Sequence, residues 1–309
     1  MIGLLLGLSG GGLAVTASFF VWRSHKHQQR SEVCSAPETG TQIPNASPLG
    51  AGKNEMQGER SYMEDRAVVC ALPGMDGALF AGMYDGHVGE AAAEFCAANL
   101  HELLAAKLAT CAGDYEAALA ATFCETNELF LQQAGEDESG TTACVMMRLG
   151  GVLYIANAGD SRCVLGSGDG TPPVQLTVDH RPDDANEYAR IEAAGGELFD
   201  AEDGNGSRVC GPNSCMLACS RSIGDRHFKP VVTSEPDTFS RPISAGDAFA
   251  ILASDGVWDE LSNLKACNLV SSSLESGCSP SEAAATLCEA AHKAGSEDNI
   301  SAIVVLLNR

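Results

Sequence analysis

Four apolar stretches of strand length in this sequence are each bordered by an aspartate, and these carboxylates are the side chains best suited to chemistry. The four arrangements are Asp85 after 78–84, Asp160 after 152–158, Asp255 after 248–253 and Asp298 before 300–307. A single Asp-Gly dipeptide is ordinary turn chemistry, so one such case would mean little. The recurrence indicates that strands deliver several carboxylates to one edge of a sheet.

Three more acidic residues, Glu64, Asp65 and Asp259, extend this candidate cluster. Like charges about 4 Å apart repel by roughly 4 kcal/mol at an effective dielectric constant near 20, so gathered carboxylates need raised pKa values or cations between them. Oxygen ligands favour Mg²⁺ or Mn²⁺, and Gly86, which lacks a Cβ, lets its carbonyl approach an ion closely. Two such ions about 3.5–4 Å apart can activate a shared water. Spacing alone leaves open the alternative that these are turn aspartates that never meet.

Two residues near these carboxylates suit a phosphate substrate. Arg60 lies four residues before Glu64, and its guanidinium would bind a phosphate dianion through two parallel hydrogen bonds. A surface ion pair is the alternative role. His87 would protonate a leaving alkoxide, and such general acid catalysis typically accelerates a reaction by about 10²–10⁴-fold. The alternative is that His87 is only a histidine in a turn. The hydroxyls of 139–142 either reach the site or merely begin a strand.

The composition narrows the classes of partner. The formal net charge of −22 disfavours nucleic acid and anionic membranes as partners of the globular part, because both are polyanions. It therefore also disfavours a metal-dependent nuclease. The thirteen cysteines include no CxxC pair and suit a reducing compartment. For the cluster of Cys210, Cys215 and Cys219, apolar packing is favoured over metal binding, since no histidine lies beside it at ligand spacing.

The N-terminal segment predicts a membrane anchor. Residues 1–22 carry no charge and are long enough to cross a bilayer, and basic residues follow at Arg23, Lys26 and Arg30. The positive-inside rule would keep the rest of the chain in the cytosol. A cleaved signal peptide or a disordered tail are the alternatives. We expect an anchor with its basic flank over 1–30, a flexible linker over 31–52 that is rich in Ser, Pro, Gly and Thr, and one globular domain over 53–309.

Within that domain the pattern alternates between strands and helices. Hairpin strands are predicted at 66–72 and 78–84, an antiparallel meander at 141–148, 152–158, 161–166 and 174–178, and helices at 90–108, 115–133, 186–194, 261–274 and 281–294. Residues 197–214 lack periodicity and are predicted to be a loop. Hairpins and paired helices favour layered α+β architecture over a doubly wound parallel sheet.

At this point the residues resemble a known family, the metal-dependent Ser/Thr protein phosphatases of type 2C. The resemblance covers about 53–309 and rests on nine motifs in family order. These are GERSYMED from Gly58, YDGHVGE from Tyr84, SGTTA from Ser139, AGDSR from Ala158, DHRP from Asp179, LACSRSIGD from Leu217, SEPD from Ser234, ASDGVWDELS from Ala253 and EDNIS from Glu297.

The resemblance implies a four-layer α-β-β-α sandwich with two central antiparallel sheets and a binuclear Mn²⁺/Mg²⁺ centre. It implies that Asp85 bridges both ions, that Asp255 and Asp298 complete one, and that Glu64 and the Gly86 carbonyl serve the other, with Asp65 just behind. Asp160, Asp259 and Asp255 would form a weaker third site. Arg60 would bind the phosphate, and His87 would be the general acid in an in-line attack by water.

The resemblance also sets the expected substrates and the open questions. Substrates would be proteins phosphorylated on serine or threonine, and the catalytic domain would be a monomer. Residues 181–216 correspond to the variable flap of the family, which influences substrate choice. Val88 departs from the small residue that is usual at its position. The rival hypothesis is a catalytically silent member that binds a kinase or scaffold, and the complete ligand set favours the enzyme.

Overall fold

The computed structural model describes residues 49–200, 206–212 and 215–307 of the chain. The predicted anchor and most of the predicted linker lie outside these residues. No helix in the described part of the chain is both long enough and apolar enough to cross a bilayer.

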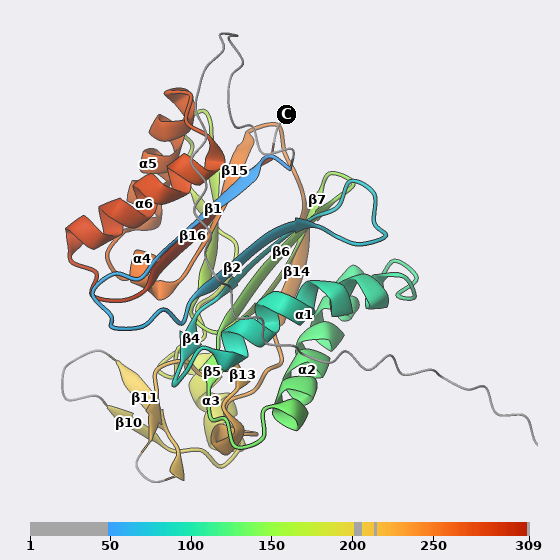
Figure 1. Ribbon diagram of the computed structural model, residues 1–309, viewed down its shortest axis with the longest axis vertical. Coiled ribbons are helices and arrows are strands. Elements are labelled where there is room, and N and C mark those ends of the chain that lie inside the picture. The colour runs from blue at the N-terminus through green and yellow to red at the C-terminus, as the bar shows by residue number, and fades with distance from the viewer. Residues whose placement is uncertain (1–48, 201–205, 213–214, 308–309) are drawn as a thin grey trace, which may run out of the picture. The chain divides into compact units, whose positions relative to one another are not determined.

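Two five-stranded antiparallel sheets form the centre of the described domain (Figure 1). The first sheet has the order β1-β16-β15-β8-β9, with strands Ala51–Met56, Ile300–Leu306, Asp247–Ala253, Arg162–Ser167 and Val174–Gln175. The second has the order β14-β7-β6-β3-β2, with strands Asp237–Pro242, Val152–Ala158, Ala143–Leu149, Leu79–Tyr84 and Arg66–Ala71. The predicted hairpin is therefore confirmed as β2 and β3.

Helix pairs cover the outer faces of the sheets, as Figure 1 shows with α5 and α6 in red and α1 and α2 in green. Helices α1 (Ala91–Leu108) and α2 (Tyr115–Gln133) pack against the second sheet, and α5 (Asn263–Glu275) and α6 (Pro280–Ala294) against the first. Helix α6 begins with a capping box in which the Ser279 hydroxyl accepts a hydrogen bond from the Glu282 backbone N–H. The expected four layers are present.

The apolar core lies in three layers because each sheet is covered on both faces. Strand β3 is buried at every residue. Its alternate side chains Phe80 and Tyr84 pack toward α1 and α2, whereas Leu79 and Met83 pack between the two sheets. A strand covered on both faces has no polar side, so the apolar run of β3 continues up to the point where the chain delivers Asp85.

The predicted meander is wrong in its pairing. Strands β6 and β7 do pair, but β8 lies in the other sheet and pairs with β15 and β9. The chain therefore crosses between the sheets at 159–161, where Asp160 lies. An alternating apolar pattern identifies a strand but not its partner. Every apolar strand presents the same backbone hydrogen-bonding groups to a neighbouring strand.

The predicted loop over 197–214 is also corrected. Strands β10 (Leu198–Asp200), β11 (Ser207–Cys210) and β12 (Met216–Leu217) form a three-stranded flap sheet beside helix α3 (Ala185–Ala193). These strands are too short for a period-two pattern to stand out. A small cluster that includes Ile191, Val209 and Leu217 holds them in place.

Candidate metal centre and active site

The strand ends of both sheets open into one cleft of about 990 Å³. Its lining includes nine of the ten residues predicted for the site: Arg60, Glu64, Asp85, Gly86, His87, Asp160, Asp255, Asp259 and Asp298. The tenth, Asp65, is buried beneath the cleft and accepts a hydrogen bond from the Ser254 hydroxyl at 2.9 Å. The structure thus brings together residues separated by more than two hundred positions in the sequence.

Asp85 is held at the end of β3 by hydroxyl groups of the strand beside it. The Thr141 hydroxyl donates to the Asp85 carbonyl at 3.0 Å, and the Asp85 N–H donates to the Thr142 hydroxyl at 3.2 Å. The Thr142 N–H also donates to the Asp85 carbonyl, at 2.9 Å. These hydroxyls therefore position the Asp85 backbone, which is a role that neither of the two alternatives left open by the sequence named.

Gly86 is required by a close approach of two backbones. A Cβ on Gly86 would lie 2.6 Å from the Glu64 carbonyl oxygen, which is closer than real contacts allow. The Glu64 N–H donates to the Asn299 side-chain oxygen at 2.8 Å, and the Asn299 amide donates in turn to the carbonyls of Gln57 and Tyr62. Asn299 therefore ties the loop that carries Glu64 to the start of β16.

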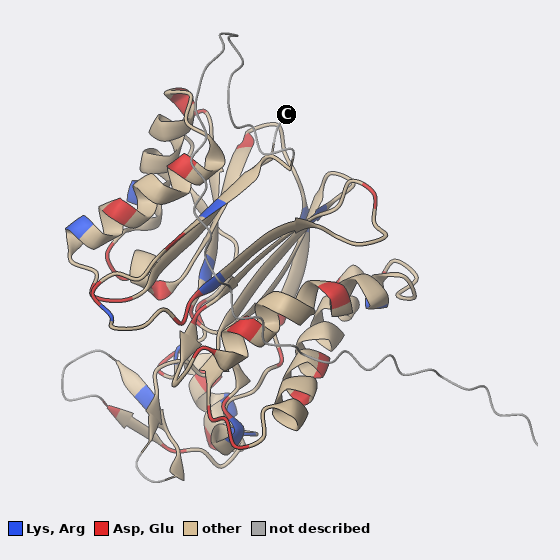
Figure 2. Ribbon diagram, viewed as in Figure 1, with Lys and Arg blue, Asp and Glu red and all other residues tan. Residues whose placement is uncertain are grey.

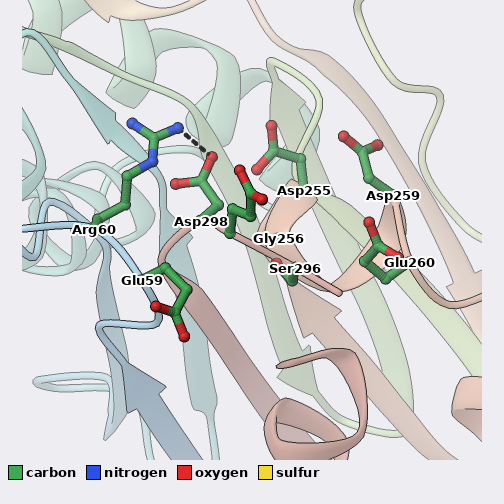
Figure 3. A pocket seen from close by; sticks show the side chains of 9 residues that line it. Glu59, Arg60, Asp255, Gly256, Asp259, Glu260, Ser296 and Asp298 are labelled. Atoms are coloured by element: carbon green, nitrogen blue, oxygen red, sulfur yellow. Dashed lines mark hydrogen bonds and ion pairs between the residues drawn. The ribbon is translucent and has the colours of Figure 1, made fainter. Parts of the chain in front are cut away.

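Asp255 and Asp298 come from the neighbouring strands β15 and β16. Asp255 begins the short helix α4 (Asp255–Trp258) directly after β15. Asp298 precedes β16 and accepts a hydrogen bond from Arg60 at 2.7 Å. Figure 3 shows Arg60 pointing at Asp298, with Asp255 and Asp259 further along the same wall. Both side chains of the Arg60–Asp298 pair are about 40% exposed, at 42% and 38%, so a ligand can reach them.

Burial and mutual repulsion dominate the electrostatics of the centre. Burial, followed by the charges of Asp255 and Asp65, raises the pKa of Asp85 well above its usual value. Burial and the neighbouring Asp160 and Asp298 do the same for the pKa of Asp255. Burial raises the pKa of Asp65 to about 6. These carboxylates are therefore close enough to repel one another, and divalent cations would relieve that repulsion.

Several of the predicted ligands have protein partners in this structure. Besides the contacts above, the Gly89 N–H donates to the Glu64 carboxylate at 2.6 Å, and Arg181 donates to Asp259 at 2.7 Å. Among the described residues, no three His, Cys, Asp or Glu side chains are arranged to hold an ion as they stand. The donor set fits Mg²⁺ or Mn²⁺ by chemistry, because it consists of oxygen atoms, several of them on buried carboxylates that repel one another.

His87 is paired with a carboxylate that the sequence analysis did not single out. Its Nε2 lies 2.8 Å from the Asp225 carboxylate, which is buried and also accepts a hydrogen bond from the Ser222 hydroxyl. Burial acts to lower the pKa of His87, but the nearby Asp225 charge outweighs it, so that the pKa is raised. The protonated ring is thereby favoured, as a general acid requires.

A small three-stranded sheet brings His87 and Asp225 together. Strands β4 (Gly86–His87), β5 (Gly140–Thr141) and β13 (Ile223–Gly224) pair so that His87, Gly140 and Gly224 lie in one row. A Cβ on Gly140 would lie 2.0 Å from the Asp225 carboxylate and 2.4 Å from His87 Nε2. Glycine is therefore the only residue type at position 140 that leaves room for the His87–Asp225 pair.

The remaining predicted residues divide between the cleft and the packing of the flap. Asp160 is 6% exposed beside the carboxylate cluster, and burial raises its pKa. Cys219 packs in the apolar cluster beneath the flap sheet, whereas Cys215 is exposed. Figure 2 shows acidic residues, drawn in red, on both outer helix pairs as well as near the ends of the central strands.

Two positioning residues, Asp225 and Asn299, were missed by the sequence analysis. Asn299 lies beside a predicted ligand, but its role depends on contacts with a loop far away in the sequence. Asp225 is the last residue of the motif LACSRSIGD and repeats the pattern of a strand that ends in a carboxylate, and these were the signals available for it. Strand β13 has only two residues, too few for the second signal to be read.

Comparison with known proteins identifies the class. A family model described as Protein phosphatase 2C matches residues 49–300. This match covers most of the chain and includes every residue of the cleft named above. The chain therefore belongs to the protein phosphatase 2C family.

Curated relatives agree with this assignment. "Probable protein phosphatase 2C 68" of Oryza sativa subsp. japonica is 39% identical over 254 residues, which cover 74% of this chain and 68% of the relative. "Protein phosphatase 2C homolog 3" of Schizosaccharomyces pombe is 35% identical over 278 residues, which cover 83% of this chain and 64% of the relative. The matched part thus spans about two thirds of the length of these relatives.

Solved structures share the fold. A serine-threonine phosphatase 2C from Toxoplasma gondii superposes with a TM-score of 0.72 at 25% identity, over 83% of this chain and 94% of the other. A C. elegans sex determining protein superposes with a TM-score of 0.76 at 26% identity, over 85% and 65% of the two chains. The layered α+β architecture is therefore that of the family.

Proposed function

We propose that this protein is a metal-dependent phosphatase that hydrolyses phosphoserine and phosphothreonine in proteins. The observation that carries the proposal is the convergence of buried carboxylates, an arginine and a histidine in one cleft. The family assignment supports the same activity, because the relatives are named protein phosphatases.

The carboxylates would hold two divalent ions, Mn²⁺ or Mg²⁺. The residues that would hold them are Asp85, Asp255, Asp298 and Glu64, together with the Gly86 carbonyl. Asp65 supports them from below, and Asp160 and Asp259 would contribute to a weaker third site. When bound, the ions would activate water and neutralise the negative charge that develops on the phosphate.

Arg60 would bind the substrate phosphate. Its guanidinium already faces an oxyanion, the Asp298 carboxylate at 2.7 Å, and a phosphate dianion offers the same planar pairing with more charge. A substrate phosphate would compete with Asp298 for Arg60. The same arginine thus serves as an ion-pair partner in one state and a phosphate ligand in the other.

His87 would protonate the leaving serine or threonine oxygen. An alkoxide is a poor leaving group, so a proton donor placed at that oxygen lowers the barrier. Asp225 orients the ring through Nε2 and keeps it protonated, while His87 itself lines the cleft. Nδ1 is then the atom left to face the substrate.

The decisive test is hydrolysis of a phosphothreonine peptide by the full chain with Mn²⁺. Asp255→Asn keeps the size of the side chain but removes a proposed ligand charge, and we expect the rate to fall by about 10²-fold or more. Asp76→Asn, an exposed residue in the β2–β3 turn, is the matched control and should leave the rate unchanged. Equal rates for wild type and Asp255→Asn would refute the mechanism. Peptide binding without hydrolysis by wild type would favour the catalytically silent alternative.

The attachment of the protein to a membrane is a separate proposal that rests on the sequence. The uncharged stretch 1–22 and its basic flank favour an anchor that leaves a monomeric catalytic domain in the cytosol. Fractionation of cells that express the chain with and without residues 1–30 tests it. Full-length protein in the soluble fraction would contradict the proposal.

A further inference from the structure

The loop over 57–62, which carries the arginine of the cleft, is held tightly against the segment that leads into β16. The Asn299 amide donates to the Tyr62 carbonyl at 2.9 Å. A Cβ on Gly58 would overlap the Asp298 carbonyl oxygen, so the two backbones are in close contact there. The side chains of this loop therefore start from fixed backbone positions.

The Tyr62 hydroxyl lies beside the guanidinium of Arg60. Arg60 Nη1 donates to this hydroxyl at 3.2 Å, while Nη2 donates to the Asp298 carboxylate at 2.7 Å. The guanidinium carbon lies 6.0 Å from the centre of the Tyr62 ring, at the outer limit of a cation–π contact. A phosphate that displaces Asp298 would therefore find the guanidinium still oriented by Tyr62.

The Tyr62 side chain opens into the catalytic cleft. Tyr62 and Arg60 both line this cleft, and Tyr62 is 48% exposed. Each terminal nitrogen of a guanidinium carries two hydrogens, so Nη1 can donate to Tyr62 and to an anion at the same time. An anion that pairs with Arg60 in the cleft would therefore come within reach of the Tyr62 hydroxyl.

A tyrosine hydroxyl is able to accept one hydrogen bond and donate another. It accepts the bond from Arg60 through a lone pair and retains its own hydrogen. Hydrogen bonds to an ionised acceptor are shorter and stronger than those to a neutral one, so a phosphate oxygen is a favourable partner for that hydrogen. The hydroxyl is also uncharged and, unlike a second arginine, is not drawn into an ion pair with the surrounding carboxylates.

We propose that Tyr62 is a further substrate-binding residue, whose hydroxyl donates a hydrogen bond to a phosphate oxygen while it holds the Arg60 guanidinium in place. The inference rests on the proposed function, because it concerns the phosphate group of the same substrate. A phosphate monoester has three terminal oxygens and is therefore able to accept hydrogen bonds from both residues at once.

Tyr62→Phe tests the hydroxyl, because it removes one oxygen atom and keeps the ring. With the full chain and Mn²⁺, we expect kcat/KM to fall about tenfold. The fall should be equal for a phosphothreonine peptide and for p-nitrophenyl phosphate, since both carry the phosphate that the hydroxyl contacts. This pattern distinguishes Tyr62 from His87, whose contribution should depend on the leaving group.

Tyr188→Phe is the matched control. Tyr188 on α3 is exposed to nearly the same extent as Tyr62, at 45%, and its hydroxyl donates to Glu192 at 3.3 Å, outside the cleft. This variant should hydrolyse both substrates at the wild-type rate. Unchanged rates in Tyr62→Phe would overturn the proposal. A fall for the peptide alone would also overturn it, because the hydroxyl would then contact the peptide and not the phosphate.

A binding measurement separates this proposal from the proposed function. Isothermal titration of the full chain with inorganic phosphate, in the presence of Mg²⁺, reports the dissociation constant without turnover. A dissociation constant about tenfold higher for Tyr62→Phe than for wild type supports the contact even if no peptide is hydrolysed. Equal dissociation constants for the two proteins, or no binding of phosphate by wild type, would overturn it even if hydrolysis is fast.

Discussion

Val88, next to the proposed general acid, has the backbone conformation that least suits its side chain. Its φ is +60°, in the left-handed region that β-branched residues avoid. The following residue, Gly89, also has a positive φ, so the turn between β4 and α1 imposes this shape. The Val88 side chain is 71% exposed and lines the cleft. Its strain is therefore not offset by packing.

Val88→Gly is expected to stabilise the protein by about 1 kcal/mol. Relief of the backbone strain should raise the free energy of unfolding by about 1–3 kcal/mol. The greater conformational freedom of glycine in the unfolded chain lowers it by about 0.5–1 kcal/mol. Urea unfolding measures the change. Val178→Gly is a fitting control, because Val178 is also exposed, at 61%, but is not among the residues with positive φ, and it should lose stability. A loss of stability in Val88→Gly would contradict the argument from strain.

If Asp225 supports His87 as the general acid, the loss of activity on its mutation should depend on the leaving group of the substrate. Asp225→Asn should lower kcat for a phosphothreonine peptide by about 10–10²-fold, since His87 loses its orientation and its proton. Hydrolysis of an aryl phosphate should fall much less, because that leaving group needs little protonation. Asp183→Asn, an exposed residue on the same cleft, should affect neither substrate. An equal loss for both substrates in Asp225→Asn would indicate a structural role instead.

At the scale of elements, the flap depends on a charged network around one buried carboxylate. Glu187 on α3 accepts hydrogen bonds from Arg221 at 2.6 Å, from Arg190 at 2.8 Å and from the Ser220 hydroxyl at 2.6 Å. Burial opposes its ionisation, but the arginines prevail and lower the pKa of Glu187 to about 2. The network ties α3 to the loop that leads into β13 and Asp225.

Glu187→Gln should loosen the flap more than the sheets. Loss of the charge leaves the partly buried Arg190 without its carboxylate partner and Arg221 with Asp237 alone, which costs roughly 3 kcal/mol. Hydrogen exchange within 181–216 should accelerate, while exchange in β3 and β16 changes little. Glu192→Gln on the exposed side of α3 is the control and should leave exchange unchanged. Uniform acceleration across both sheets would show that Glu187 stabilises the whole domain instead.

Local sequence patterns predicted the bounds of the helices but not the pairing of the strands. Helix α2 lies at its predicted bounds, and α6 begins one residue before its predicted start, because periodicity and capping act within a few residues. The assignment of β8 to the first sheet was not predictable in this way. Strand pairing depends on contacts distant in the sequence, and an apolar strand is compatible with many partners.

At the scale of the whole molecule, the carboxylate cluster costs stability without cations. Asp85, Asp255 and Asp65 have pKa values raised by burial and by one another. A carboxyl group with a higher pKa in the folded state binds more protons when folded. Its contribution to stability is therefore full below about pH 4 and is lost as the pH rises through the folded pKa, which for Asp65 is about 6.

Asp255→Asn should consequently stabilise the metal-free protein while it abolishes activity. In excess chelator at about pH 7.5, we expect its free energy of unfolding to exceed that of wild type by about 1 kcal/mol or more, and the gap should close toward about pH 4. Urea unfolding over this pH range provides the measurement, with Asp76→Asn as the control. A wild type that is more stable than Asp255→Asn in chelator would contradict the proposed repulsion.

Divalent ions should make wild type more stable than Asp255→Asn, which reverses the order expected in chelator. Mn²⁺ at about a hundred times its dissociation constant would stabilise wild type by about 2.7 kcal/mol through preferential binding to the folded state. Asp255→Asn should gain much less, because it has lost a proposed ligand. Thermal unfolding with and without Mn²⁺ measures both values. Equal gains for the two proteins would place the ions elsewhere.

The sequence by itself predicted which residues meet in the cleft, because the ordered motifs contain every predicted ligand together with Arg60 and His87. It also determined the α+β class and the position of most helices. Only the tertiary structure decided that β7 and β8 belong to different sheets, that Asp225 supports His87, and that Asn299 ties the loop of Glu64 to the start of β16. These features depend on contacts between segments far apart in the chain, and such contacts leave no periodic trace in either segment alone.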